Sequence, residues 1–193
     1  EAKNITSLYL CPHDRKPLPR FQPSQSLTLR LILPGDDDPV ERNFPVSSSP
    51  SPDFYRITVE RNNNDPVSHY IHTSVNPHTI LKVGAPRGEF CIDTTLFRPL
   101  AMIAEGVGIA PFVSMIEEAV ESNSQRSITL FYSVQNQDEH AMPYHLKSLE
   151  AQYCNLKVVT IFRDEDESDA CDYAGPMTVD LLRSVLHSNN FDF

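Results

Sequence analysis

The sequence predicts a β-rich domain followed by an α/β domain with a parallel sheet. Before residue 98, short apolar runs are separated by clusters of proline, glycine, serine and aspartate. After residue 99, strand-like runs alternate with amphipathic helical stretches, which is the pattern of right-handed βαβ units. The length of 193 residues suffices for one large domain or two small ones. We therefore expect two domains, at residues 1–98 and 99–193.

The first domain is expected to consist mainly of antiparallel strands. The candidate strands are short runs bounded by turn residues, at residues 5–10, 27–33, 42–46, 55–60 and 80–83. Strands at this spacing are typical of an antiparallel sandwich or barrel. Residues 67–75 are an exception, because their apolar positions recur at helical spacing after Asp65-Pro66, and they predict a short helix.

The second domain is expected to alternate parallel strands with helices. The candidate strands are apolar runs at residues 100–104, 128–134 and 156–162. Apolar stripes predict helices over residues 112–120 and 144–153, and after Thr178, whose side chain can cap a helix N-terminus. Residues 191–193 resemble the start of a further strand, at which the sequence stops. We therefore expect the α/β domain to be truncated at its C-terminus.

The composition argues against several classes of partner and site. The formal net charge of −10 disfavours nucleic acid and anionic membrane surfaces. No apolar run approaches the roughly 20 residues of a membrane-spanning helix, so no membrane span is expected. None of the four cysteines lies in a Cys-x-x-Cys pair, and we expect no metal site. Isolated thiols without a secretory signal favour a reducing compartment, so a cytoplasmic location is expected.

The most informative local pattern is the turn Gly106-Val107-Gly108-Ile109-Ala110-Pro111. It follows a predicted strand and opens a predicted helix, which places it at the carboxyl edge of the sheet, where ligands bind. Glycine lets a ligand approach the backbone closely, and a helix N-terminus favours a phosphate. Pro111 fits the first helical turn. A tight strand-to-helix turn without a ligand is the alternative.

Two patterns in the first domain could also bind phosphate or an aromatic ligand. Arg42 lies two residues before Phe44 at the end of a predicted strand, so its guanidinium could pair with phosphate while the ring packs on a flat ligand. Val67 and Ser68 begin the predicted short helix, where N–H groups can receive a pyrophosphate. The alternatives are an edge-strand arginine with a core phenylalanine, and an ordinary helix cap.

The order of these patterns resembles the ferredoxin–NADP⁺ reductase superfamily, and most closely the reductase modules of flavohaemoglobins and similar oxygenase reductases. The family pattern Arg-x-Tyr-Ser-x-Ser is matched by residues 42–47, with Phe44 and Pro45 in place of its tyrosine and first serine. The later family patterns follow in the same order, at residues 55–61, 67–68, 86–90, 106–111 and 175–178. The resemblance covers essentially the whole chain.

The resemblance implies a flavin-binding Greek-key β-barrel followed by a domain that binds NAD(P). Arg42 would bind the flavin phosphates, and Phe44 would pack against the isoalloxazine ring. Val67 and Ser68 would hold the pyrophosphate, and the glycine turn would receive the nicotinamide nucleotide. The full set of expected cofactor-binding residues is Arg42, Phe44, Pro45, Val46, Ser47, Val59, Arg61, Val67, Ser68, Gly106, Val107, Gly108, Ile109, Ala110, Pro111 and Thr178.

The resemblance also implies a flavin-dependent oxidoreductase that passes electrons from NADH or NADPH through FAD to a partner. FAD is expected rather than FMN, and the acceptor would be a ferredoxin-like, globin or oxygenase domain or protein. Gln135 stands where many members carry an arginine that binds the 2′-phosphate of NADP, which favours NADH. Pro45, Glu105 and the expected truncation motivate an alternative, a degenerate, non-catalytic scaffold or interaction module. The truncated chain could also bind flavin without efficient turnover.

Overall fold

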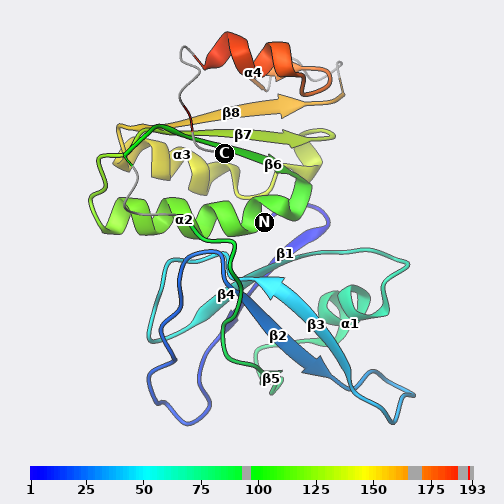
Figure 1. Cartoon of the computed structure of the whole chain (residues 1–193). Helices are drawn as coiled ribbons and strands as arrows, with labels where there is room; N and C mark the ends of the chain where they lie inside the picture. Colours follow the sequence, from blue (N-terminus) through cyan, green and yellow to red (C-terminus); the bar gives the residue numbers. More distant parts are fainter. Residues whose placement is uncertain (93–96, 165–170, 187–190, 192–193) are drawn as a thin grey trace.

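The computed structural model consists of two stacked lobes (Figure 1). It describes residues 1–92, 97–164, 171–186 and 191. The lower lobe in Figure 1 contains antiparallel strands from the first half of the chain, and the upper lobe contains a parallel sheet between helices.

Two antiparallel sheets form the first lobe. Strand β1 (Ile5–Leu10) pairs with β4 (Tyr55–Glu60), while β2 (Ser26–Leu31) lies between β3 (Val40–Pro45) and β5 (Lys82–Val83). Inward side chains of both sheets pack with the buried face of helix α1 (Pro66–Ser74) in one apolar core. Isolated bridges, such as the one between Val46 and Ile57, connect irregular parts of this lobe. The expected barrel therefore takes the form of two sheets around a shared core.

A parallel sheet forms the second lobe. Its strands run in the order β6 (Leu100–Glu105), β7 (Ile128–Val134), β8 (Leu156–Phe162) and β9 (Tyr173–Ala174). Helices α2 (Ala110–Glu121) and α3 (Pro143–Gln152) cover one face, and α4 (Val179–Val185) covers the other. All seven residues of β7 are buried, as expected for a strand with helices on both faces. Short 3₁₀ helices, η1 (Gly106–Ile109) and η2 (Gln137–Glu139), follow β6 and β7.

The predicted fold class is confirmed, because antiparallel sheets precede a parallel α/β sheet. The strands predicted at residues 5–10, 55–60, 128–134 and 156–162 have those bounds. The strand predicted at 80–83 is reduced to β5, because only Lys82 and Val83 pair with β2, and the two-residue β9 was not predicted. Of the strand predicted at 191–193, residues 192 and 193 lie outside the described part. The domain boundary at residues 98 and 99 stays a prediction.

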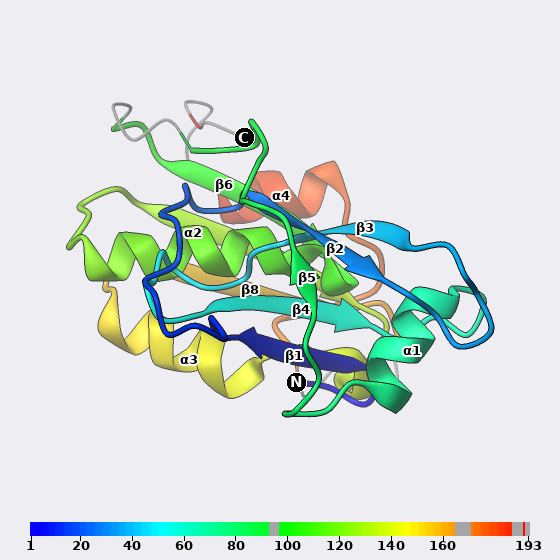
Figure 2. The same ribbon diagram turned by 90° about the horizontal axis from the view of Figure 1, so that it is seen from below.

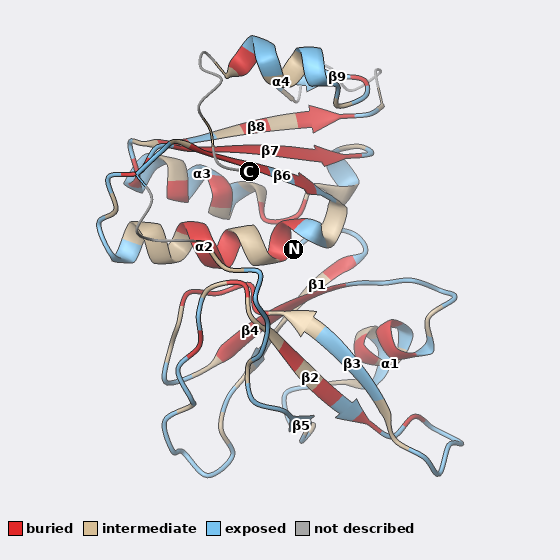
Figure 3. Ribbon diagram, viewed as in Figure 1, coloured by how far each residue is buried: buried red, intermediate tan, exposed pale blue. Residues whose placement is uncertain are grey.

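The two lobes meet along α2 and the loop that joins β3 to β4. Figure 2, viewed from below, shows β1 and β4 lying over the helical layer of the second lobe. Buried residues occur in both lobes and along this contact (Figure 3). Ile5 of β1 belongs to the apolar core of the second lobe, and the Lys3 N–H donates to the Asp138 carbonyl (3.0 Å). The lobes are therefore packed against each other.

Within the ranges that the structure describes, none of the helices has both the length and the apolar character that crossing a bilayer requires.

Candidate functional site

The first candidate region lies where β3 approaches the start of α1. Arg42 Nη2 stands 3.8 Å from Asp65 Oδ1. The Asp65 carboxylate also caps α1, because it accepts hydrogen bonds from the N–H groups of Val67 (3.3 Å) and Ser68 (3.2 Å). The structure thus brings together Arg42, Val67 and Ser68, the residues expected to contact flavin phosphates. The Asp65 carboxylate contacts all three residues, so a negatively charged group of the chain already lies among them.

Three further residues from the expected set lie beside this region. Ser68 is buried, and its hydroxyl accepts from the N–H of Asn62 (3.0 Å), which ties the helix start to the preceding loop. Val59 is buried in the core, and its carbonyl lies 3.0 Å from His72 Nε2. Arg61 is exposed, so its guanidinium is accessible to a ligand. This end of the first lobe therefore offers cationic side chains around a helix start.

Residues 44–47 point in different directions at the end of β3. Phe44 and Pro45 are half-buried, whereas Val46 and Ser47 are fully buried. The Ser47 hydroxyl lies 2.8 Å from Thr58 Oγ1 and accepts a hydrogen bond from Arg56 Nε (3.3 Å). Phe44 packs against the apolar core of the first lobe and is only partly exposed, Pro45 is also partly exposed, and the Ser47 side chain faces the interior of the protein.

The second candidate region is the glycine turn at the carboxyl end of β6. Gly106 has a φ of +53°, which favours glycine, and it begins η1. A Cβ added to Gly106 or Gly108 would have no described atom within 4 Å beyond its neighbours in the chain. Ile109 and Ala110 are buried and anchor the turn in the core, and Pro111 lies in the first turn of α2. The turn exposes backbone to an approaching ligand, as a nucleotide site requires.

Thr178 has a different environment from the rest of the expected nucleotide site. Its hydroxyl accepts a hydrogen bond from the N–H of Leu181 (3.2 Å) and so caps α4. Helix α4 follows β9, at the opposite edge of the described sheet from β6. The structure therefore does not place Thr178 beside the glycine turn.

Arg163 is a charged residue near the glycine turn that the sequence analysis did not identify. It directly follows β8, and its guanidinium forms an ion pair with the carboxylate of Glu105 at the end of β6. The side chains of Arg163 and Glu105 are 41% and 63% exposed, so the contact is accessible to solvent. Glu105, which would repel a phosphate if it were unpaired, has its charge offset by Arg163. The signal in the sequence was the position of Arg163 at the end of a predicted strand, because the carboxyl ends of parallel strands meet at one edge.

His140 lies past the carboxyl end of β7. Its ring contacts Tyr132 and Phe162, with centroid distances of 5.4 and 5.8 Å. Burial, aided by the charge of Lys147, lowers the pKa of His140 to about 4. His140 is therefore neutral near pH 7, and it packs this sheet edge as an uncharged aromatic ring.

The family comparison identifies the second lobe. Residues 102–193 match the sequence profile of the family described as the oxidoreductase NAD-binding domain. A flavohemoprotein of Xylella fastidiosa (strain 9a5c) is 32% identical over 193 residues, a stretch that is 100% of this chain and 48% of that protein. The chain thus spans about half the length of the curated relatives it matches.

Solved structures extend the similarity to both lobes. The flavohem-like FAD/NAD-binding domain of nitric oxide dioxygenase from Vibrio cholerae has a TM-score of 0.91 and 28% identity, covering 100% of this chain and 81% of that one. The flavohemoglobin of Malassezia yamatoensis, solved with bound FAD and heme, has a TM-score of 0.86 at 17% identity, covering 99% of this chain and 48% of that one. The second likeness concerns the fold alone.

Proposed function

Because the chain belongs to the ferredoxin–NADP⁺ reductase superfamily, as the reductase modules of flavohaemoproteins do, we propose that it oxidises NAD(P)H with a bound flavin and passes the electrons to a separate acceptor. The observation that carries this proposal is the open glycine turn at the carboxyl end of β6, in a chain whose two lobes together match an FAD/NAD-binding domain. The acceptor would be a globin, ferredoxin-like or oxygenase domain or protein.

FAD is the proposed flavin. Arg42 and the exposed Arg61 offer positive charges for the phosphates of such a cofactor, and the N–H groups of Val67 and Ser68 would receive a phosphate that displaces Asp65. Phe44 and Pro45 would contact the ring system. When bound, the flavin would supply the redox chemistry, and this chain would supply orientation and electrostatic tuning. The residues of Gly106–Ile109, with Ala110 and Pro111, would hold the nicotinamide nucleotide.

NADH is the proposed electron donor. Gln135 is neutral and therefore cannot offset the charge of a 2′-phosphate. Arg163 is cationic, but Glu105 already pairs with it. Because Gln135 is neutral and Arg163 is paired with Glu105, the 2′-phosphate of NADPH should add little binding energy at this edge of the sheet.

Reconstitution of the purified chain tests this proposal. After incubation with FAD and removal of excess cofactor, the protein should show a flavin spectrum, and NADH should bleach it under anaerobic conditions. FMN and NADPH in parallel samples test the two finer choices. A chain that stays colourless with excess FAD and excess FMN would disprove the flavin proposal.

A non-catalytic scaffold is the second candidate function, and one contact favours it. Asp65 already bonds the N–H groups that a flavin phosphate would need, which disfavours a tightly bound flavin. The two candidates differ in their dependence on Arg42. Loss of flavin uptake in Arg42→Ala would support the reductase function. A parent chain that never takes up flavin, with partner binding that survives Arg42→Ala, would support the scaffold function.

A further inference from the structure

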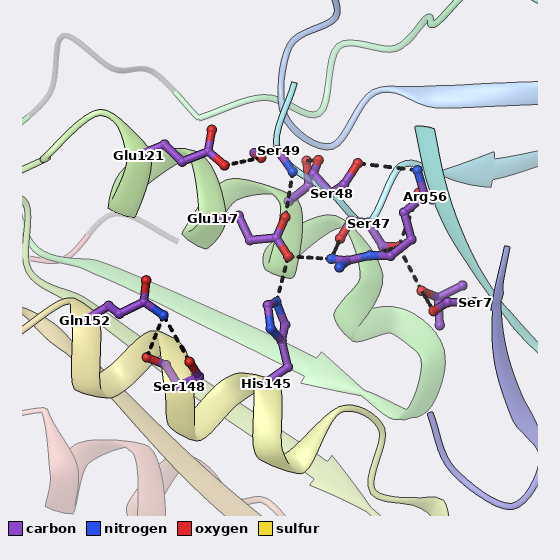
Figure 4. Close-up of polar contacts among 12 residues, drawn as sticks. Ser7, Ser47, Ser48, Ser49, Arg56, Glu117, Glu121, His145, Ser148 and Gln152 are labelled. Atoms are coloured by element: carbon purple, nitrogen blue, oxygen red, sulfur yellow. Dashed lines mark hydrogen bonds and ion pairs between the residues drawn. The ribbon is translucent and has the colours of Figure 1, made fainter. Parts of the chain in front are cut away.

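A buried polar network joins the two lobes (Figure 4). Arg56 of β4 and Glu117 of α2 form an ion pair with a distance of 2.5 Å between Nη2 and Oε1. Their side chains are only 9% and 12% exposed, so the pair is almost completely removed from water. A buried pair of this kind leaves an uncompensated charge if either partner is removed.

Both carboxylate oxygens of Glu117 have partners. Oε1 contacts Arg56 and also lies 2.6 Å from Nε2 of His145 on α3, and Oε2 accepts a hydrogen bond from the Ser49 N–H (2.7 Å). Burial raises the pKa of Glu117, but the hydrogen bond from His145 and the charge of Arg56 outweigh burial and lower that pKa below its ordinary value. Glu117 is therefore ionised and links three elements of the fold.

Arg56 fixes the loop that follows β3. Its guanidinium donates to the carbonyl and to the hydroxyl oxygen of Ser47, and its backbone N–H donates to Ser48 Oγ (3.3 Å). Helix α2 holds the same loop at two more points. Glu121 accepts from the Ser49 hydroxyl (2.6 Å), and the Ser114 hydroxyl donates to the Ser48 carbonyl (2.6 Å).

The two ends of this network lead directly to the two candidate cofactor regions. The loop of residues 47–49 continues from Phe44 and Pro45, the proposed contacts of the flavin ring. Helix α2 continues from the glycine turn, the proposed nucleotide site. Any shift of α2 against the loop would move one site relative to the other.

We propose that Arg56 and Glu117 are positioning residues that set the distance and angle between the flavin ring and the nicotinamide nucleotide. This inference rests on the proposed function. Contacts between lobes of one chain permit relative motion unless specific interactions fix them, and hydride transfer needs the reacting atoms in near-contact geometry. Neither residue needs to touch a cofactor to control the rate, because each holds an element that does.

Glu117→Gln tests the proposal, because it removes the charge and keeps the shape. The matched control is Glu118→Gln, since Glu118 is the next residue on α2 and its carboxylate has no hydrogen bond or ion pair with a described residue. Stopped-flow mixing with NADH should show flavin reduction slowed about 100-fold in Glu117→Gln, because a displacement near 1 Å has an effect of this order. The dissociation constants of FAD and NADH should stay within about threefold of the parent values. The variant keeps the contacts that bind each ligand equally well before and during the reaction. Glu118→Gln should behave as the parent.

His145→Ala keeps the proposal testable if Glu117→Gln does not fold. His145 is more than one-third exposed, so its removal should leave a folded protein with a smaller loss of the flavin reduction rate and unchanged binding constants. The proposal would be overturned if flavin reduction in His145→Ala is as fast as in the parent, and if it is also as fast in a folded variant of Glu117 or Arg56.

Amide hydrogen exchange in the loop of residues 47–49 separates this proposal from the proposed function, because the Ser49 N–H donates to Glu117. If the parent chain binds no flavin, the proposed function fails, but Glu117→Gln should still speed exchange in this loop relative to Glu118→Gln. Identical exchange and identical reduction rates would show that the network does not hold the two lobes in register.

Discussion

The two regions expected to bind phosphate groups differ in whether a group of the chain itself already occupies the place of the phosphate. At the start of α1, the N–H groups of Val67 and Ser68 donate to Asp65, which also lies beside Arg42. At the glycine turn, the backbone around Gly106 and Gly108 has open space. The turn therefore leaves room for a ligand, whereas a ligand at α1 would compete with a carboxylate of the chain.

A residue outside a motif can therefore occupy the groups that the motif offers to a ligand. The Val-Ser pattern is present at the start of α1, but the residue that precedes Pro66 brings a negative charge. We therefore expect nucleotide binding to depend mainly on backbone shape, and flavin binding to depend mainly on charge.

The largest expected effect is that of Gly106→Val. A β-branched side chain is strained at a φ of +53°, and its methyl groups would occupy the space that a nucleotide needs. We expect kcat/KM for NADH to fall about 100-fold, as a misplaced substrate implies, while FAD affinity is unchanged. Steady-state kinetics and flavin titration measure the two quantities.

Gly35→Val is the matched control for this change. Gly35 also has a positive φ (+91°) and lies in an exposed turn between β2 and β3. It should suffer the same backbone strain without loss of NADH oxidation. An equal loss in both variants would attribute the effect to strain alone and remove the evidence for a nucleotide at Gly106.

Arg42→Ala should have the next largest effect, on the flavin rather than on NADH. Loss of a charge-assisted hydrogen bond to phosphate corresponds to about 2 kcal/mol, or about 30-fold in the FAD dissociation constant. Arg30→Ala, on the neighbouring strand β2, is the control, because Arg30 pairs only loosely with Glu41 at 4.0 Å. If both variants bind FAD as the parent does, Arg42 is not a phosphate ligand.

Asp65→Asn should strengthen FAD binding. Asparagine is as good a helix N-cap as aspartate, so α1 should remain stable while the negative charge is removed. We expect FAD to bind about fivefold more tightly at low salt, a gain of about 1 kcal/mol that screening should reduce at high salt. Asp53→Asn, in the loop between β3 and β4, should show no gain. Weaker FAD binding in Asp65→Asn would mean that the carboxylate assists the cofactor instead of competing with it.

The fold was largely predictable because its strongest elements have local signals. Residues 128–134 are mostly apolar or β-branched, and all seven residues of β7 are buried. Residues 55–60 alternate less clearly, yet the turn residues on either side define β4. Weak elements were not predicted because they lack such local signals. The two residues of β9 have no periodicity, and Ile80 is exposed although its residue type favours a strand.

The site was predictable only where one segment of chain forms it. The glycine turn is contiguous, so its strand, turn and helix could be recognised together. The pairs Arg56–Glu117 and Glu105–Arg163 join residues 61 and 58 positions apart. Such pairs depend on which strands and helices become neighbours. The end of a predicted strand placed Arg163 at the ligand-binding edge of the sheet, but no local pattern paired it with Glu105. The cap at Asp65 is local, but its contact with Arg42 depends on the packing of β3 against α1.

The smallest expected effect concerns the choice between NADH and NADPH. Glu105→Gln removes the carboxylate that pairs with Arg163 and leaves a positive charge at the end of β8. Because exposed ion pairs contribute at most about 1 kcal/mol, the ratio of kcat/KM for NADPH to that for NADH should rise only about threefold. The nucleotide with the additional phosphate gains from the released cation, while NADH gains little.

The double variant Glu105→Gln/Arg163→Gln decides whether Arg163 causes that rise. If the released guanidinium attracts the 2′-phosphate, the double variant should return the ratio to the parent value. A rise that persists without Arg163 would instead reflect the removal of a repulsive carboxylate beside the glycine turn. In that case a negative charge beside the glycine turn would influence nucleotide binding in addition to backbone shape, and the contrast with the charge-dependent region at α1 would weaken.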